Sequence, residues 1–165
     1  METAALMREM IDYFAGDPRR IQHFTKVYEY ARLIGLLEGL DAKTQFTLET
    51  AAIVHDIGIR TGEEKYGRND GKIQEELGPE EAKKMLEHLG YDTDTIQRVC
   101  YLVGHHHTYH TMDGMDYQIL VEADFLVNLY EDESPRTAIE TALERIFRTK
   151  SGTDICRSMF GIGAD

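Results

Sequence analysis

Cysteine, proline and long apolar runs are scarce in this sequence, and each scarcity excludes a class of protein. The 165 residues include two cysteines, Cys100 and Cys156, which stand far apart and predict a reduced, cytoplasmic chain rather than a disulfide scaffold. No apolar run is long enough to cross a bilayer, and the opening METAALMREMIDYF mixes acids with apolar residues, unlike a signal peptide. Three prolines and no Gly/Ser-rich tract leave no linker, so the length predicts one domain.

Positive charge is also scarce, with 18 Lys and Arg against 30 Asp and Glu. This balance argues against a nucleic-acid duplex or an anionic membrane as the main partner, because both attract basic surfaces. A small anionic substrate remains compatible, because a few basic side chains or a metal cation can create a local positive field. The sequence has no glycine-rich phosphate loop followed by lysine and serine, and no GxSxG motif, which speaks against an NTP-driven machine and a serine hydrolase.

Strand-like alternation is missing as well, because nearly every segment has helical periodicity. Asp17-Pro18 and Ser134-Pro135 each place a capping residue before a proline, which is a typical helix start, and Asp41 is a further cap. The predicted fold is therefore all-α and compact. Its helices are predicted over about 18–39, 42–57, 79–89, 93–104, 117–130 and 135–149, with Ser151 capping a short final one.

The segment 61–78, TGEEKYGRNDGKIQEELG, is polar and punctuated by glycine. We expect it to be mainly an ordered loop with at most one turn of helix, because it lacks an apolar stripe. Pro79 is expected to open the helix that follows, since proline suits a first helical position. Gly58 is expected to stop the helix before it.

Two acidic residues lie in otherwise apolar helical segments. Asp56 follows His55 in AAIVHDIG, and Asp124 lies in ILVEADFLVNL. A buried carboxylate without a partner is very costly, so a cation or a hydrogen-bond network must compensate each one. With His23 these residues supply the imidazoles and carboxylates of a divalent metal site. Adjacent helical residues point about 100° apart, so His55 and Asp56 can share a metal only from a terminal turn.

The order His23, His55-Asp56, Asp124 resembles the HD superfamily of metal-dependent phosphohydrolases. The resemblance rests on HFTKVYEYA, AAIVHDIG and VEADFLVN in that order, and it spans about 21–130. It implies a single HD-like helical domain over 1–165, in which helices of 134–160 pack on the motif-bearing core. It also implies that these four residues bind one divalent transition metal, with Mn, Fe, Co, Ni and Zn all left open.

Some HD proteins hold a second metal, bridged by the counterpart of Asp56 and bound by two more histidines. The stretch QEELG has no histidine where one of them is usual, although Glu75 or Glu76 could supply an oxygen ligand. The other would come from GHHHTYH, where His105 or His106 is the candidate and a loose surface metal-binding tract is the alternative. We therefore expect one metal and leave room for a second.

The resemblance implies a metal-activated water that attacks a phosphate ester of a nucleotide or related small molecule. Asp56 would orient this water, and His105 or His106 would protonate the leaving group. Lys26, one turn after His23, and Lys72 are candidate contacts to the substrate phosphate. The sequence leaves open whether the chain forms a homodimer.

Two rival functions share this pattern. A di-iron oxygenase would use two metals to activate dioxygen, and the missing histidine in QEELG weighs against it. A nucleotide-sensing module would bind its ligand at the metal without turnover. The full set of His23, His55, Asp56 and Asp124 disfavours a sensor, because pure binding requires no activated water.

Overall fold

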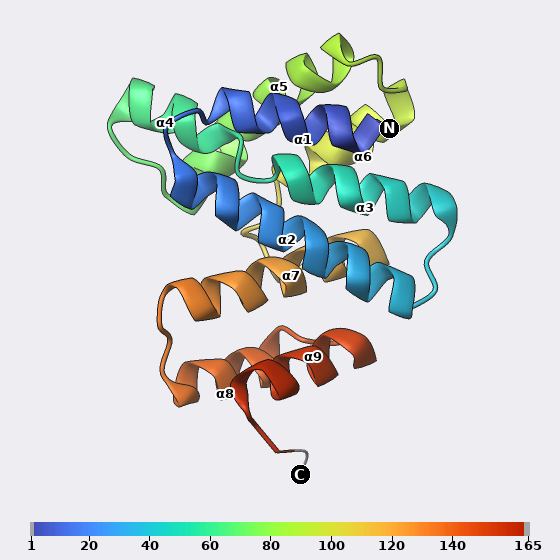
Figure 1. Cartoon of the computed structure of the whole chain (residues 1–165), viewed down its shortest axis with the longest axis vertical. Coiled ribbons are helices and arrows are strands. Elements are labelled where there is room, and N and C mark those ends of the chain that lie inside the picture. Colours follow the sequence, from blue (N-terminus) through green and yellow to red (C-terminus); the bar gives the residue numbers. More distant parts are fainter. Residues whose placement is uncertain (1, 164–165) are drawn as a thin grey trace.

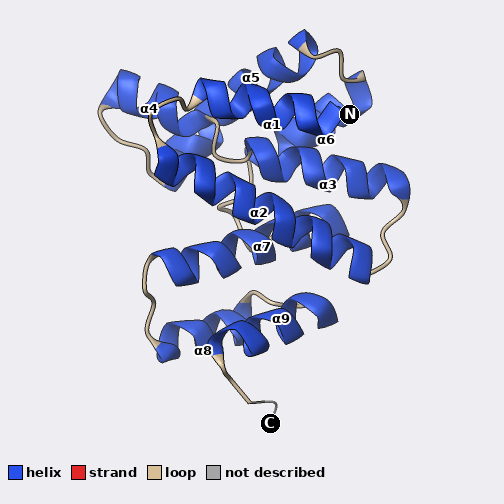
Figure 2. Ribbon diagram, in the orientation of Figure 1, coloured by secondary structure: helices blue, strands red, loops and turns tan. Residues whose placement is uncertain are grey.

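Helices joined by short loops form the whole of residues 2–163, which are the residues that the computed structural model describes; no strand occurs in that range (Figures 1 and 2). This confirms the all-α prediction. The nine helices of the described range are α1 (Glu2–Tyr13), α2 (Pro18–Leu37), α3 (Ala42–Val54), α4 (Gly58–Tyr66), α5 (Gly71–His88), α6 (Thr93–Val103), α7 (Met115–Glu131), α8 (Arg136–Arg145) and α9 (Lys150–Phe160).

Five helix starts in the described range have side-chain caps that satisfy otherwise unpaired backbone N–H groups. The Asp17 carboxylate accepts from the backbone N–H three residues on, at 3.1 Å, and Asp41 does the same at 2.9 Å. The predicted end of α8 and the predicted cap of α9 were wrong. α8 ends at Arg145 rather than near Thr149, and Thr149, not Ser151, caps α9 by accepting from the Gly152 N–H at 2.9 Å.

The loop predicted over 61–78 is wrong, because the chain is helical there except at a short connection. α4 occupies the first part and α5 begins at Gly71, capped by Asp70, which accepts from the Ile73 N–H at 3.2 Å. Both helices lie at the surface and bury only a narrow stripe of side chains. Their polarity therefore reflects solvent exposure, and the sequence gives little apolar signal for either helix.

The glycines of this region allow two helices to approach closely instead of stopping them. Gly58 begins α4, and a Cβ there would lie 2.8 Å from the backbone nitrogen of Gly78 on α5. Pro79 lies inside α5 rather than at its start. A helix rarely passes through the residue before proline because its Cβ crowds the ring, and Gly78 has no Cβ.

The centre of the molecule is formed by α2, α3 and α7, which pack on one another (Figure 1). The helices α1, α4, α5 and α6 lie on one side of this centre, while α8 and α9 lie on the other, against α7. The fully buried core side chains include Phe24, Ile34, Leu48, Ile53 and Leu120. Within residues 2–163, no helix is both long and apolar enough to cross a membrane.

Candidate metal centre

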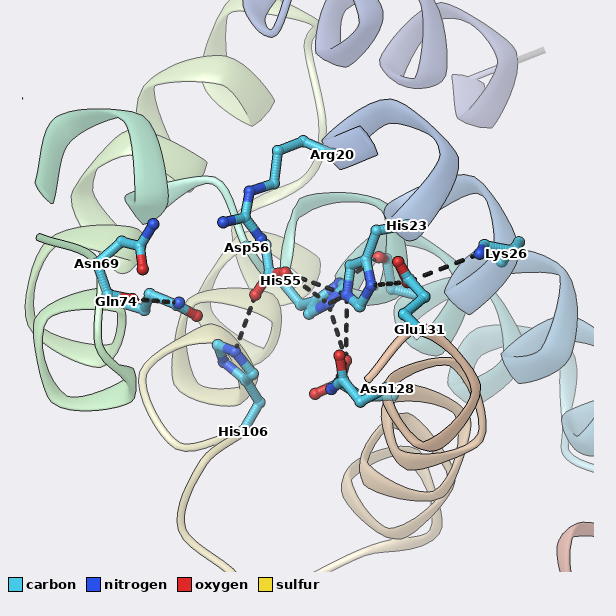
Figure 3. A network of polar contacts seen from close by, with 12 residues as sticks. Arg20, His23, Lys26, His55, Asp56, Asn69, Gln74, His106, Asn128 and Glu131 are labelled. Carbon is cyan, nitrogen blue, oxygen red and sulfur yellow. Dashed lines mark hydrogen bonds and ion pairs between the residues drawn. The ribbon is translucent and has the colours of Figure 1, made fainter. Parts of the chain in front are cut away.

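Four polar side chains from the three central helices converge in the interior (Figure 3). His23 comes from α2, His55 and Asp56 from the turn that follows α3, and Asp124 from α7. Each is at most 8% exposed. α3 ends at Val54, so His55 and Asp56 leave the helix on a turn and reach the same point, as the sequence analysis required.

Five distances between the donor atoms of this cluster are similar. His23 Nε2 lies 3.2 Å from His55 Nε2, from Asp56 Oδ2 and from Asp124 Oδ1. His55 Nε2 lies 3.4 Å from the same two carboxylate oxygens. Adjacent ligands that lie about 2.0–2.2 Å from one metal stand about 3.0–3.5 Å apart, so these spacings suit ligands of one cation.

Outer hydrogen bonds fix which ring nitrogen faces the cluster. His23 Nδ1 donates to Glu131 Oε1 at 2.6 Å, and His55 Nδ1 donates to the Ala52 carbonyl at 2.7 Å. Both Nε2 atoms therefore carry a lone pair toward the centre when the rings are neutral. Two lone pairs at 3.2 Å repel each other unless a proton or a metal lies between them.

The electrostatics of the cluster favour a positive charge. Burial opposes a charged ring, but hydrogen bonds to Asp124 and Asp56 raise the pKa of His23 to about 10. Burial likewise opposes the charged forms of the two carboxyls. The neighbouring histidines nevertheless lower the pKa of Asp56 well below its usual range, and that of Asp124 also falls. A metal cation would satisfy the same carboxylates and leave the imidazoles neutral, as ligands must be.

His106 adds a further nitrogen to one side of the centre. Its Nδ1 donates to the Val103 carbonyl at 2.8 Å, so Nε2 is free to accept. That Nε2 is buried, lies 3.4 Å from Asp56 Oδ1, and has no hydrogen-bond partner among the described residues. A buried polar atom without a partner indicates a missing ligand, water or ion.

The neighbouring His107 also turns inward. Its Nε2 donates to Gln74 Oε1 at 2.8 Å, and Gln74 Nε2 donates to the Asn69 carbonyl at 2.6 Å. Ligand atoms of Asp56, His106 and His107 lie within 4.8 Å of one another. The ligand atoms of His23, His55 and Asp56 lie equally close together. The described residues thus hold two overlapping donor groups that share Asp56.

The structure leaves His105, Glu75 and Glu76 outside both donor groups. His105 donates through Nδ1 to the Tyr101 carbonyl and stacks on the Tyr101 ring at 4.1 Å. Glu75 accepts from the Thr108 hydroxyl at 2.9 Å. Glu76 lines a separate hollow on the exposed side of α5. Of the two predicted histidines, His105 and His106, the structure brings His106 to Asp56, and neither Glu75 nor Glu76 joins a donor group.

The two candidate lysines occupy different positions. Lys26 lies 3.7 Å from Glu131, the carboxylate that holds His23, and is therefore one contact away from the cluster. Lys72 lines the same hollow as Glu76, away from the convergent donors. Of the two, only Lys26 lies beside the cluster.

Three further residues near the centre were not predicted from the sequence. Asn128 donates to Asp124 Oδ1 at 3.0 Å, and Glu131 orients His23. They stand four and seven residues after Asp124, on the same face of α7, and this spacing is the signal that could have found them. Arg20 precedes His23 by one turn, and its side chain extends from α2 toward Asp56 in Figure 3.

Comparisons with known proteins agree with this geometry. The family model described as the HD domain matches residues 20–146, most of the chain. A crystal structure of a predicted HD superfamily hydrolase from an uncultured Thermotogales bacterium is similar in fold, with a TM-score of 0.67 and 24% identity over 96% of this chain and 84% of that one. Among curated proteins, no sequence matches the chain significantly.

Proposed function

The chain belongs to the HD domain family, and we propose that it is a metal-dependent phosphohydrolase that cleaves a phosphate ester of a small molecule. The observation that carries the proposal is the convergence of His23 Nε2 with three other donor atoms at the spacing of a metal's ligands. The Nε2 of His106 has no hydrogen-bond partner among the described residues. It therefore offers a position for a further ligand, which a closed structural metal site would not have. A structural metal usually has its whole shell supplied by protein, whereas a catalytic one keeps an open position.

The proposed reaction breaks the ester P–O bond. Water adds OH to phosphorus, and the leaving oxygen takes up the remaining proton to give an alcohol and phosphate. A metal at this site supplies two effects, a lower pKa for a bound water and polarisation of a phosphoryl oxygen. His23, His55, Asp56 and Asp124 would hold it.

The chain's own residues would manage the proton and the phosphate charge. Asp56 directs Oδ2 to the other ligands and Oδ1 to His106 Nε2, so Oδ1 can orient the attacking water and accept its proton. His106 can then carry a proton toward the leaving oxygen. Arg20, on the same side as Asp56, offers a guanidinium to the phosphoryl oxygens (Figure 3).

A second cation is the alternative that a specific observation supports. Asp56, His106 and His107 form the second donor group. One iron in each of the two groups would make oxygenase chemistry possible. We favour one metal because the stretch 74–78, QEELG, supplies no histidine to this second group. A sensing module that binds without turnover is the remaining alternative.

Elemental analysis of the purified protein tests the proposal, with Asp56→Ala and Asp124→Ala beside the wild type. We expect one transition metal per chain in the wild type and loss of at least nine-tenths of it in both variants. Glu133→Ala, an exposed change near the end of α7, is the control and should keep the metal. Phosphate release from a panel of phosphate esters should then be abolished in the Asp56 variant.

The other outcomes distinguish the two-metal alternative, the sensor and a protein without a metal site. A second metal that is lost in His107→Ala would establish the two-metal alternative. Metal binding with ligand affinity but no turnover of any ester would support the sensor. A wild-type protein that takes up no metal even after reconstitution would end the proposal.

A further inference from the structure

A mostly apolar groove lies between α7 and α8, beside the metal centre. Its volume is about 490 Å³, within the usual range of small-molecule pockets. Its lining includes Tyr109, Phe125, Leu129, Ala138, Thr141 and Arg145. The reaction described above uses none of these residues.

The groove and the metal centre share two turns of α7. Asp124 and Asn128, four residues apart, form one row that faces the ligands. Phe125 and Leu129 form the next row, about 100° further around the helix, and face the groove. A molecule with one end at Asp124 can therefore lay its other end along the adjoining row.

Tyr109 lines the groove at Phe125, the residue next to Asp124. It follows the histidine cluster in the chain, and its ring packs edge-on against Phe125 with the ring centres 5.3 Å apart. Tyr109 follows His107 by two residues, so the loop that places His107 beside the metal centre also carries the ring that lines the groove.

We propose that this groove holds the ring-bearing part of the substrate's leaving group while the phosphate lies at the metal centre. The inference rests on the proposed function and deepens it, because it assigns Tyr109 and Phe125 as specificity-determining residues. Aromatic side chains favour flat rings in offset or edge-on contact. Thr141 and Arg145 offer a hydroxyl and a guanidinium that can bind the heteroatoms of such a ring.

A pair of substrates with the same leaving oxygen tests the inference. Ribose 5-phosphate and a nucleoside 5′-monophosphate differ only in the ring attached to the sugar. We expect kcat/KM to be at least tenfold higher for the nucleotide with the wild-type protein. Phe125→Ala and Thr141→Trp, which empty and fill the groove, should each remove most of this preference.

The matched control is Glu140→Ala, on the exposed side of α8, where Glu140 pairs with Arg136. It should keep the full preference. Thr141 is exposed, so its replacement is not expected to prevent folding. Equal kcat/KM for the two substrates, or a preference unchanged in both groove variants, would overturn the inference while leaving the phosphohydrolase intact.

A binding measurement covers the case in which no ester is turned over, which would count against the proposed function alone. The probe is 1-naphthyl phosphate, which is not consumed in this case, followed by its own fluorescence with the metal-loaded wild-type protein. We expect Kd to rise at least tenfold when Phe125→Ala or Thr141→Trp is added, and to remain unchanged with Glu140→Ala. Unaltered Kd in both groove variants would refute the groove as a ring site.

Discussion

At the scale of single residues, the hydrogen bond between Glu131 and His23 gives the clearest prediction. The Glu131 carboxylate accepts the Nδ1–H of His23, which leaves the lone pair on Nε2. The same bond makes Nε2 a more basic ligand for a metal. We expect Glu131→Ala to weaken metal affinity by about 10- to 100-fold, the usual cost of losing such a partner. Competition with a chromogenic chelator measures this affinity directly.

Two companion variants show whether this effect comes from the hydrogen bond. Glu131→Gln keeps an acceptor oxygen and should recover part of the lost affinity. Glu133→Ala removes an exposed acid two residues away and should change nothing. If all three variants bind metal like the wild type, the His23–Glu131 contact does not support the site.

The same scale shows how far sequence can identify a site. His55, Asp56 and Asp124 were predicted because they lie in apolar helical segments, and His23 because the order of the four residues resembles the HD superfamily. The structure brings the four together. The choice among His105, His106 and His107 could not be made, since consecutive residues leaving a helix point in different directions. The turn after α6 decides it, because it stacks His105 on the Tyr101 ring and brings His106 Nε2 to 3.4 Å from Asp56 Oδ1.

At the scale of elements, the crossing of α4 and α5 supports the His55-Asp56 turn. A Cβ on Gly58 would lie 2.8 Å from Gly78 N and 3.0 Å from the Gln74 carbonyl, and these backbone atoms cannot move aside singly. We expect Gly58→Ala to destabilise the protein by about 1–3 kcal/mol, the typical cost of overpacking. Urea unfolding measures this change.

The same variant should also bind metal less well, because Gly58 lies two residues after Asp56. Glu64→Ala, an exposed change on α4, should leave stability within about 0.5 kcal/mol, as surface substitutions usually do. An unchanged urea midpoint in Gly58→Ala would mean that α4 and α5 can separate without cost.

The helix predictions succeeded where the signal is local in the sequence and failed where it depends on distant contacts or on burial. Asp17 and Asp41 were recognised because a helix start has a local chemical requirement that a side chain can meet. The helix α4 and the part of α5 before Pro79 were missed because they are mostly exposed and bury few apolar residues. Gly58 and Gly78 were interpreted as breaks, whereas their role is a contact between helices distant from the local sequence.

At the scale of the whole molecule, the metal centre joins α2, α3 and α7, the three helices on which the others pack. Without a cation, two buried carboxylates meet two imidazoles that must become charged to balance them. A metal that binds only the folded state stabilises it by about 2.7 kcal/mol at 100 times its Kd. Removing it with a chelator should therefore lower the melting temperature by about 5–10 °C, since each kcal/mol shifts a domain of this size by about 2–4 °C.

The shift must depend on the proposed ligands. Asp124→Ala should melt at the same temperature with and without chelator, because it has no bound metal to lose. Re-addition of the metal should restore the wild-type melting temperature, which separates metal loss from a direct effect of the chelator. An unchanged wild-type melting temperature after complete removal of the metal would show that the three central helices are held by their apolar contacts alone.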